Sequence, residues 1–177
     1  MAAEPDPVTE LDFLSFVDHA VRRASAELPV VDPEAMRLVL TLSRTASALV
    51  YDLESSVHRP RGLSWAGFRL LFVLWLAGPA EPKRVAELSG MSRAAVSALV
   101  NTLSRAGLVA KAAAPSDRRS IRLALTDDGH SLITEAFAAH NQREQSWAAG
   151  LTEAESGTLI ALLGKLMAGA GTAKRRT

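Results

Sequence analysis

One segment of the sequence, residues 81 to 107, constrains the fold more than any other. Pro82 begins a short helix-forming run, Gly90 interrupts it, and Ser92 precedes a second run from Arg93 to Arg105. Proline is tolerated in the first turn of a helix, a serine oxygen caps the free amides of the next one, and glycine favours the turn between them. The segment therefore predicts two helices joined by a tight turn, the helix-turn-helix arrangement.

Two strand-like runs follow this segment directly. The stretches GLVAKAAA (107–114) and RSIRLALT (119–126) flank a polar Pro-Ser-Asp sequence, and apolar residues alternate in the second run. Alternation with a period of two is typical of a half-buried strand, so the pair predicts a β-hairpin, or wing. Asp117, Arg118 and Arg119 are expected at its exposed turn.

The remaining sequence predicts helices. Apolar residues recur at helical spacing, and a capping residue precedes most of the runs. The capping residues are Asp32, Ser64, Thr126 and the pair Thr152 and Glu155. The expected fold class is therefore mostly α with a small β-hairpin wing, a winged helix-turn-helix with additional long helices. These helices are expected at residues 11–28, 33–57, 65–76, 127–149 and in a last apolar segment that ends near residue 168.

The charge of the chain is segregated. Its formal net charge is +1, but eight basic and two acidic residues lie between Lys83 and Arg122, which gives this segment +6 and leaves −5 for the rest. A cationic module within a near-neutral chain is typical of proteins that bind a polyanion such as nucleic acid. Double-stranded DNA is therefore the expected partner of this region.

The helix expected from Arg93 to Arg105 has the composition of a helix that reads DNA. One face is apolar, and the other carries small and polar residues without a single acid, which lets the backbone approach base edges and phosphates. The alternative is an ordinary amphipathic surface helix, although such helices usually carry Glu and Lys. The expected DNA contacts here are Ser92, Arg93, Ala94, Ser97, Asn101 and Arg105.

The arginines of the wing complete the candidate surface. A guanidinium suits the narrow, electronegative minor groove of A·T-rich DNA, so Arg118 and Arg119 are expected to contact DNA. Asp117 can hold one guanidinium in position, and we expect it to orient the arginines rather than to touch DNA. The alternative for these residues is a solvated turn.

These motifs together resemble the multiple antibiotic resistance regulator (MarR) family of winged helix-turn-helix repressors. The most specific stretches are LSRAGLV at 103–109 and the pattern DRR…LALT…G at 117–129, and the similarity covers about residues 33–166. The resemblance implies that Ser92 to Arg105 is the recognition helix in a major groove. It also implies that Arg119 is the wing-tip contact in a flanking minor groove.

The resemblance further implies a homodimer and a domain plan. Long helices at 33–57 and 130–168 would form the dimer interface, whereas the extra helix at 11–28 departs from the family pattern. The expected segments are a flexible start with the extra helix (1–31), a dimerisation helix (32–60), the winged DNA-binding lobe (61–127), and C-terminal dimerisation helices with a basic tail (128–177).

The resemblance also implies a ligand site. Proteins with this resemblance often bind phenolic, anionic or aromatic compounds between the dimerisation helices and the DNA-binding lobe. A cation beside aromatic surface suits an aromatic carboxylate. In the alternative, which the sequence favours, the aromatic side chains are core and Arg69 pairs with an acidic neighbour. The candidate ligand-binding residues are Tyr51, His58, Trp65, Phe68, Arg69 and Phe72.

Several function classes find no support in the sequence. There is no cysteine, which excludes disulfides and a thiol-based oxidation switch. No metal or other cofactor is expected, because the sequence lacks the spacings of His, Cys and acidic residues that bind metals. No enzymatic activity is expected either, because a nucleophile elbow, a phosphate loop and paired carboxylates are missing. The absence of a long apolar run or a signal segment predicts no membrane contact and a cytoplasmic location. The four histidines, none of them an i, i+4 pair, are His19, His58, His130 and His140.

The expected function is that of a transcriptional regulator that binds a palindromic operator as a homodimer and represses until a small aromatic or anionic ligand releases it. Two alternatives stay open: a winged-helix module that binds an acidic protein, and a metal-responsive repressor of related shape.

Overall fold

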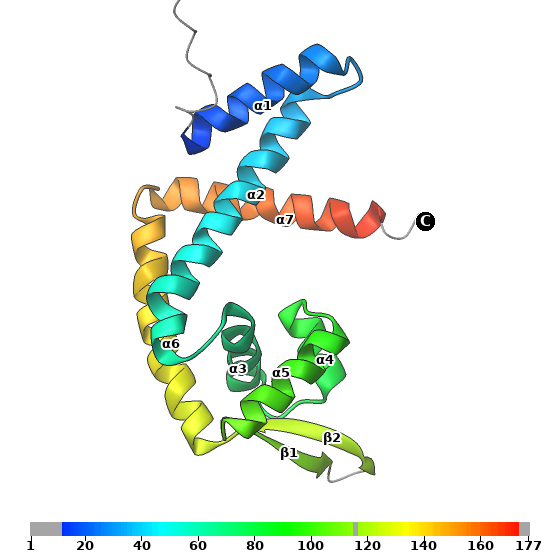
Figure 1. The fold of residues 1–177 in the computed structure, drawn as a ribbon, viewed down its shortest axis with the longest axis vertical. Coiled ribbons are helices and arrows are strands. Elements are labelled where there is room, and N and C mark those ends of the chain that lie inside the picture. Colours follow the sequence, from blue (N-terminus) through cyan, green and yellow to red (C-terminus); the bar gives the residue numbers. More distant parts are fainter. Residues whose placement is uncertain (1–11, 115–116, 174–177) are drawn as a thin grey trace, which may run out of the picture. The chain divides into compact units, whose positions relative to one another are not determined.

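The computed structural model of the chain describes residues 12–114 and 117–173 (Figure 1). The flexible start and the basic tail expected from the sequence fall largely on residues 1–11 and 174–177, which lie outside the described residues. Helices dominate the rest, and the described sheet is one antiparallel pair, which confirms the mostly α fold with a hairpin wing. The elements are α1 (Phe13–Glu27), α2 (Pro33–Leu53), a π-helical turn (Glu54–His58), a 3-10 turn (Arg59–Arg61), α3 (Trp65–Ala77), α4 (Pro82–Ser89), α5 (Arg93–Arg105), β1 (Val109–Ala114), β2 (Asp117–Leu125), α6 (Asp127–Ala148) and α7 (Glu153–Ala173).

The chain divides into two compact units between Ser55 and Ser56. This boundary falls inside the segment 32–60 that the sequence assigns to one dimerisation helix. The first unit is the helix pair α1 and α2, and α1 is the extra helix that the sequence predicts. Val17 and Val21 of α1 are each 3% exposed and form the core of this pair.

The helix α2 begins where the sequence predicts and ends earlier. Asp32 caps it by accepting hydrogen bonds from two backbone amides of the first turn, both at 3.0 Å. The regular helix stops at Leu53 instead of Val57 and passes into the π-helical and 3-10 turns. Pro60 prevents a regular α-helix from continuing past these turns, because it has no amide hydrogen for the carbonyl of Ser56 and its ring clashes with that carbonyl.

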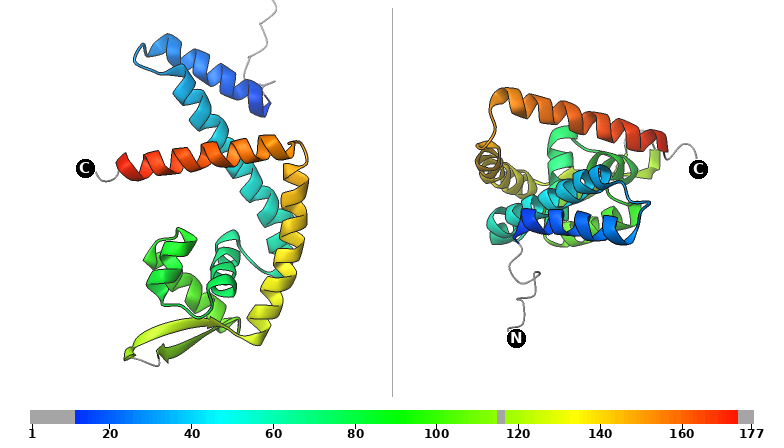
Figure 2. Two further views of the ribbon diagram at one scale, coloured as in Figure 1. Left: turned by 180° about the vertical axis from the view of Figure 1, so that it is seen from behind. Right: turned by 90° about the horizontal axis from the view of Figure 1, so that it is seen from above.

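The helix α3 lies at the centre of the core of the second unit. Its residues Leu70 and Leu71 are fully buried, and α4, α5, α6 and β2 all contact α3 (Figure 2). The loop before α4 joins this core to the wing, because Ala80 exchanges two backbone hydrogen bonds with Leu123 of β2, at 3.0 and 2.8 Å. The wing and the helix-turn-helix are therefore parts of one lobe.

Side-chain caps fix the helix ends of the second unit. Ser64, Ser92 and Thr126 each accept a hydrogen bond from a first-turn amide, of α3, α5 and α6 respectively, at 3.0 to 3.1 Å. At α7 the Thr152 amide donates to the Glu155 carboxylate at 2.8 Å, and the Glu155 amide donates back to the Thr152 hydroxyl at 3.3 Å. Every cap predicted from the sequence is confirmed.

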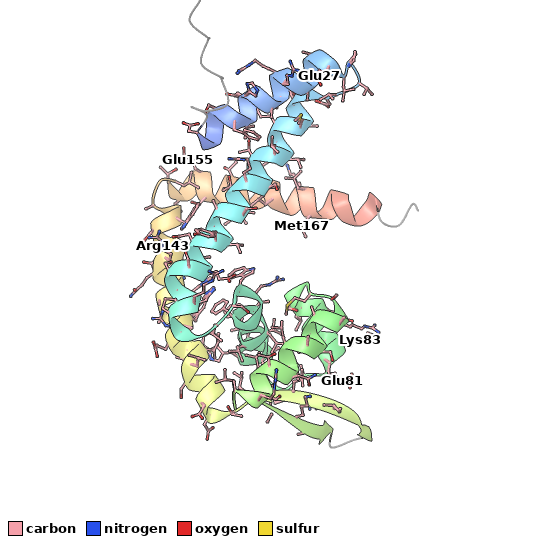
Figure 3. All side chains as sticks on the ribbon, in the orientation of Figure 1. Glu27, Glu81, Lys83, Arg143, Glu155 and Met167 are labelled. Atoms are coloured by element: carbon pink, nitrogen blue, oxygen red, sulfur yellow. The ribbon has the colours of Figure 1, made fainter. Side chains whose placement is uncertain are left out.

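The C-terminal helix α7 leaves its apolar side chains uncovered. No residue of its segment 153–169 is buried. Ile160 is 70% exposed and Met167, labelled in Figure 3, is 75% exposed. An apolar helix with this much exposed surface favours a partner that covers it. Within the described ranges, no helix is both long and apolar enough to span a membrane.

Candidate nucleic-acid interface

The turn between α4 and α5 is built around Gly90. This residue has φ +66°, a left-handed conformation that glycine adopts at little cost at the end of a helix. The guanidinium of Arg69, on α3, donates a hydrogen bond to the backbone carbonyl of Ser89, directly before this turn. The turn that orients α5 is therefore held by the left-handed backbone of Gly90 and by the hydrogen bond from Arg69 of α3.

The helix α5 presents the face that the sequence predicts. Val96, Val100 and Leu103 point into the core and are 0%, 4% and 5% exposed. The opposite face is open to solvent and has no acidic residue, and Ser92 at its start uses its hydroxyl as the cap. The predicted contact residues on this open face are all exposed: Ser92, Arg93, Ala94, Ser97, Asn101 and Arg105.

The wing lies next to α5 and has an irregular tip. The strands pair in register from Val109 with Leu125 to Ala113 with Ile121, and the register then shifts so that Ala114 pairs with Asp117. Asp117, Arg118 and Arg119 are thus the first residues of β2 at the tip end of the hairpin. Their side chains lie outside the described residues, so their DNA contacts remain predictions.

One contact on this surface has no counterpart in the sequence predictions. Lys111 of β1 donates a hydrogen bond from Nζ to Oδ1 of Asn101 on α5, at 2.7 Å. The two residues are ten positions apart, and both are exposed. The signal was present in the alternation of the first strand, which places Lys111 on the same face as the buried Val109 and therefore towards α5.

The described charges around α5 leave the surface cationic. Glu87 of α4 is engaged with Arg84 at 3.3 Å, and both side chains are about half exposed. Arg122 of β2 donates to the carbonyl of Pro79 at 2.5 Å, which positions its guanidinium without neutralising it. Glu81 and Lys83 lie at the start of α4 (Figure 3). A surface of this kind attracts the phosphates of DNA and makes binding depend on salt.

Four of the six predicted ligand-binding residues come together, and the other two lie elsewhere. His58, Trp65, Phe68 and Phe72 come together in a stack, in which the His58 ring lies 4.2 Å from Phe68 and 5.5 Å from Trp65 between centroids. Arg69 lies apart from these contacts, because its guanidinium is bonded to the end of α4 instead of the acidic neighbour that the sequence suggests. Tyr51 belongs to α2 in the first unit, and its side chain is 71% exposed.

The stack continues through residues of α6 that the sequence reasoning missed. Phe137 lies 5.2 Å from Phe72 and 5.3 Å from Trp75, and the His140 ring lies 4.6 Å from Phe68, all between ring centroids. Phe137 and His140 are three positions apart and so share a helix face. We define the aromatic stack as His58, Trp65, Phe68, Phe72, Trp75, Phe137 and His140.

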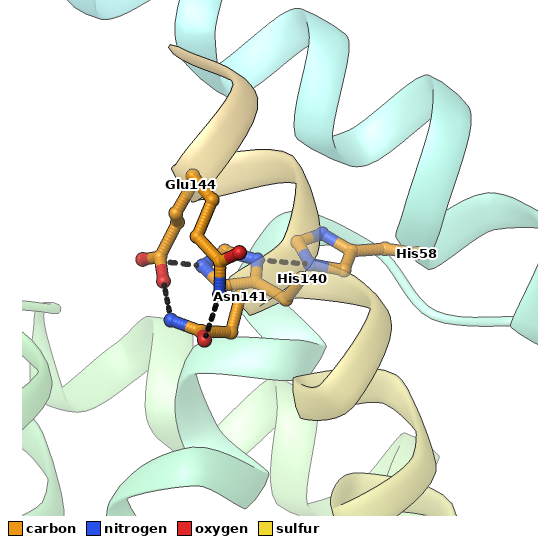
Figure 4. Close-up of polar contacts among 5 residues, drawn as sticks. His58, His140, Asn141 and Glu144 are labelled. Carbon is orange, nitrogen blue, oxygen red and sulfur yellow. Dashed lines mark hydrogen bonds and ion pairs between the residues drawn. The ribbon is translucent and has the colours of Figure 1, made fainter. Parts of the chain in front are cut away.

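Two buried histidines form a polar chain inside the aromatic stack (Figure 4). His58 Nε2 and His140 Nδ1 are 3.1 Å apart, and His140 Nε2 lies 3.0 Å from the Glu144 carboxylate. Because a carboxylate only accepts, His140 Nε2 donates to Glu144, and the contact between the two rings joins one donor nitrogen and one acceptor nitrogen. The described residues contain no group of three or more His, Asp or Glu suited to hold a metal ion.

A helix pair with a glycine turn, an open acid-free second helix and a hairpin bonded to the same lobe is a winged helix-turn-helix, a fold of DNA-binding proteins. A sequence model of the MarR family matches residues 61–120 of the chain. The chain belongs to the MarR family of transcriptional regulators, which are DNA-binding proteins and not enzymes.

Relatives of known sequence or structure agree with this assignment. YwaE of Bacillus subtilis (strain 168), an uncharacterized HTH-type transcriptional regulator, is 32% identical over 151 residues, which cover 84% of this chain and 88% of YwaE. The HTH-type transcriptional regulator PecS of Dickeya dadantii (strain 3937) is 28% identical over 85% of this chain and 92% of PecS. A solved structure of Bordetella bronchiseptica BpsR, whose DNA binding is regulated by 6-hydroxynicotinic acid, matches with 27% identity and a TM-score of 0.67 over 74% of this chain and 98% of BpsR.

Proposed function

We propose that this regulator is a repressor that binds a palindromic operator as a homodimer and releases it when a small aromatic or anionic molecule binds. The observation that carries the proposal is the open, acid-free face of α5 beside the wing. In this arrangement α5 reads a major groove, Arg118 and Arg119 reach a flanking minor groove, and Asp117 orients them. The proposed contacts on α5 and at its cap are Ser92, Arg93, Ala94, Ser97, Asn101 and Arg105.

The exposed apolar side chains of the long helices support a homodimer. In the second unit α7 exposes them along its length, and in the first unit α2 exposes three of them in its first half. A second copy of the chain would cover such surface, and two recognition helices about one DNA turn apart favour an inverted repeat as the operator. The exposed apolar residues are Leu38, Val39 and Leu42 on α2, and Leu159, Ile160, Leu162, Leu166 and Met167 on α7.

The aromatic stack supports a ligand of the proposed class. The DNA binding of BpsR is regulated by 6-hydroxynicotinic acid, an aromatic carboxylic acid. In this chain Trp65 and Phe72 of the stack are half-buried, which leaves ring surface for a planar molecule. A ligand that binds better to the DNA-free arrangement of the dimer shifts the population towards it.

Nuclease protection tests the proposal. The purified protein is added to duplexes from the chromosomal surroundings of its own gene, with and without a panel of aromatic carboxylates at increasing concentration. We expect protection of one inverted repeat, lost steeply with added salt and abolished by at least one compound. Equal protection of unrelated duplexes, or no protection at all, would contradict the proposal and favour a winged module that binds an acidic protein.

A further inference from the structure

The hydrogen bond between Lys111 and Asn101 changes what this part of the interface can recognise. We propose that the two residues act as one donor-only unit, in which Asn101 holds the Lys111 ammonium at the open face of α5 and both side chains together bind a group that offers hydrogen-bond acceptors alone. Two parts of DNA have this chemistry: the N7 and O6 edge of guanine, and the phosphate oxygens. The inference rests on the proposed contact between α5 and DNA.

The geometry fixes which polar atoms face outward. The Asn101 carbonyl oxygen accepts the 2.7 Å bond from the Lys111 ammonium, so the amide nitrogen with its two hydrogens is left for a ligand. Lysine has three donor hydrogens and uses one of them here. In the described part of the chain neither side chain makes a further side-chain bond and Lys111 forms no ion pair, so the unit presents donors and a positive charge.

Lys111 also lines a hollow in the surface of the lobe. The hollow measures about 140 Å³ and lies between the start of α4, α5 and the wing, and the Lys111 ammonium bonds to Asn101 at the exposed face. This arrangement keeps the ammonium beside α5 instead of free in solvent. The hollow is lined by Pro82, Ser97, Val100, Lys111, Ile121 and Leu123.

The alternative for Asn101 is that it reads adenine by itself. An asparagine that reads adenine accepts a hydrogen bond from the N6 amino group and donates one to N7. Here the accepting oxygen is already engaged with a cation, and charge-assisted hydrogen bonds of this length are the stronger kind. Guanine needs two donors and a phosphate needs donors and positive charge, so both match the unit as it stands.

A double-mutant cycle tests the unit. Wild-type protein selects duplexes from a random-sequence library, and the dissociation constant of the most enriched duplex is measured for Asn101→Ala, Lys111→Met and the double variant. We expect each single variant to weaken binding about tenfold and the double variant to be no weaker than about twice a single one. Additive losses, about a hundredfold in the double variant, or unchanged binding of either single variant would overturn the inference.

Two controls make the cycle specific. Lys83→Met removes another lysine of the lobe that is not bonded to Asn101, so its effect should add to that of Asn101→Ala. Asn101→Asp can still hold Lys111 but cannot donate, so we expect it to bind DNA at least as weakly as Asn101→Ala. Wild-type binding by Asn101→Asp would overturn the inference. Thermal unfolding of each variant, all changed at exposed positions, checks that the fold is kept.

The selected sequences distinguish guanine from phosphate. If the unit reads guanine, both single variants lose the preference for one guanine per half-site, and 7-deazaguanine at that position weakens the wild type but not the variants. If it binds phosphate, the preferences stay and the slope of binding against salt falls by about two for Lys111→Met, one for each half-site. Either result supports the unit. A wild type that enriches no duplex would overturn the proposed function as well, whereas additivity in a protein that binds overturns this inference alone.

Discussion

Gly129 lies so close to the backbone of Leu108 that a Cβ on the glycine would be 2.0 Å from the Leu108 carbonyl oxygen. Thr126 fastens the same place, because its amide donates to the Leu108 carbonyl at 3.1 Å and its hydroxyl donates to the Gly107 carbonyl at 2.6 Å. The first turn of α6 is thus held against the turn between α5 and β1. A glycine is required there because two backbones approach each other.

Gly129→Ala should therefore lower the free energy of unfolding by about 3 kcal/mol, since a carbonyl cannot move aside as a flexible side chain can. Denaturant unfolding measures the change. Gly150→Ala is the matched control, because nothing lies within 4 Å of its added Cβ, and it should change stability by less than about 0.5 kcal/mol. Equal effects of the two substitutions would contradict the close contact.

His140→Ala should destabilise the protein by about 2–4 kcal/mol, because it opens a cavity in the aromatic stack and leaves His58 Nε2 without its hydrogen-bond partner. His130 is an exposed histidine on the same helix. The control His130→Ala should be nearly neutral, within about 0.5 kcal/mol. A His140→Ala variant as stable as the wild type would show that the 3.1 Å histidine contact contributes nothing to the fold.

Arg119→Ala should weaken operator binding by about 1–3 kcal/mol and leave the dimer intact, since the wing arginine is proposed to contact DNA and not the partner subunit. A gel-shift titration over a range of salt concentrations measures both affinity and salt dependence. Arg22→Ala, which removes an exposed cation of α1, serves as the control and should not alter binding. Unchanged affinity of Arg119→Ala would remove the wing from the interface.

Ile160→Glu with Met167→Glu should convert the protein to a monomer, because two carboxylates would be buried in the proposed interface of α7. Sedimentation at micromolar concentration gives the mass directly. The variant should also lose operator affinity, since one half-site contact replaces two. A variant that sediments like the wild type would place the interface elsewhere.

Acid should loosen the start of α7. Hydrogen bonds from the backbone and side chain of Thr152 lower the pKa of the Glu155 carboxyl. A carboxyl whose pKa is lower in the folded state stabilises it at pH values above its ordinary pKa, and this contribution is lost as the pH falls through the folded value. Unfolding from pH 7 to pH 3 should therefore show a smaller pH dependence for Glu155→Gln than for the wild type. Identical profiles would contradict the capping role of the charge.

Local patterns in the sequence were sufficient for most of the fold. A cap such as Ser92 or Thr126 acts on amides two or three residues away, and the turn at Gly90 depends on one backbone conformation, so neither needs knowledge of distant residues. The end of α2 was predicted too late, because the apolar pattern continues past Leu53 into the π-helical turn.

Contacts between distant residues could not be predicted in the same way. His58 and His140 are 82 positions apart, and no spacing within either helix indicates that their rings meet. The partner of Arg69 is the backbone carbonyl of Ser89. Every residue type has such a carbonyl, so the sequence could not indicate this contact. For Lys111 the strand pattern gave the face, but the bond to Asn101 depends on how closely the wing packs against α5.

The two hydrogen bonds that Ala80 and Leu123 exchange join the hairpin to the helices of one lobe, so we expect them to move as one unit. We therefore do not expect the wing to change its angle to the helices when the protein releases DNA. In the proposed homodimer, a ligand is therefore expected to act by changing the distance between the two DNA-binding lobes. Insertions or deletions at the tip of the hairpin would then change how far the wing extends along the duplex. They would not change the response to the ligand.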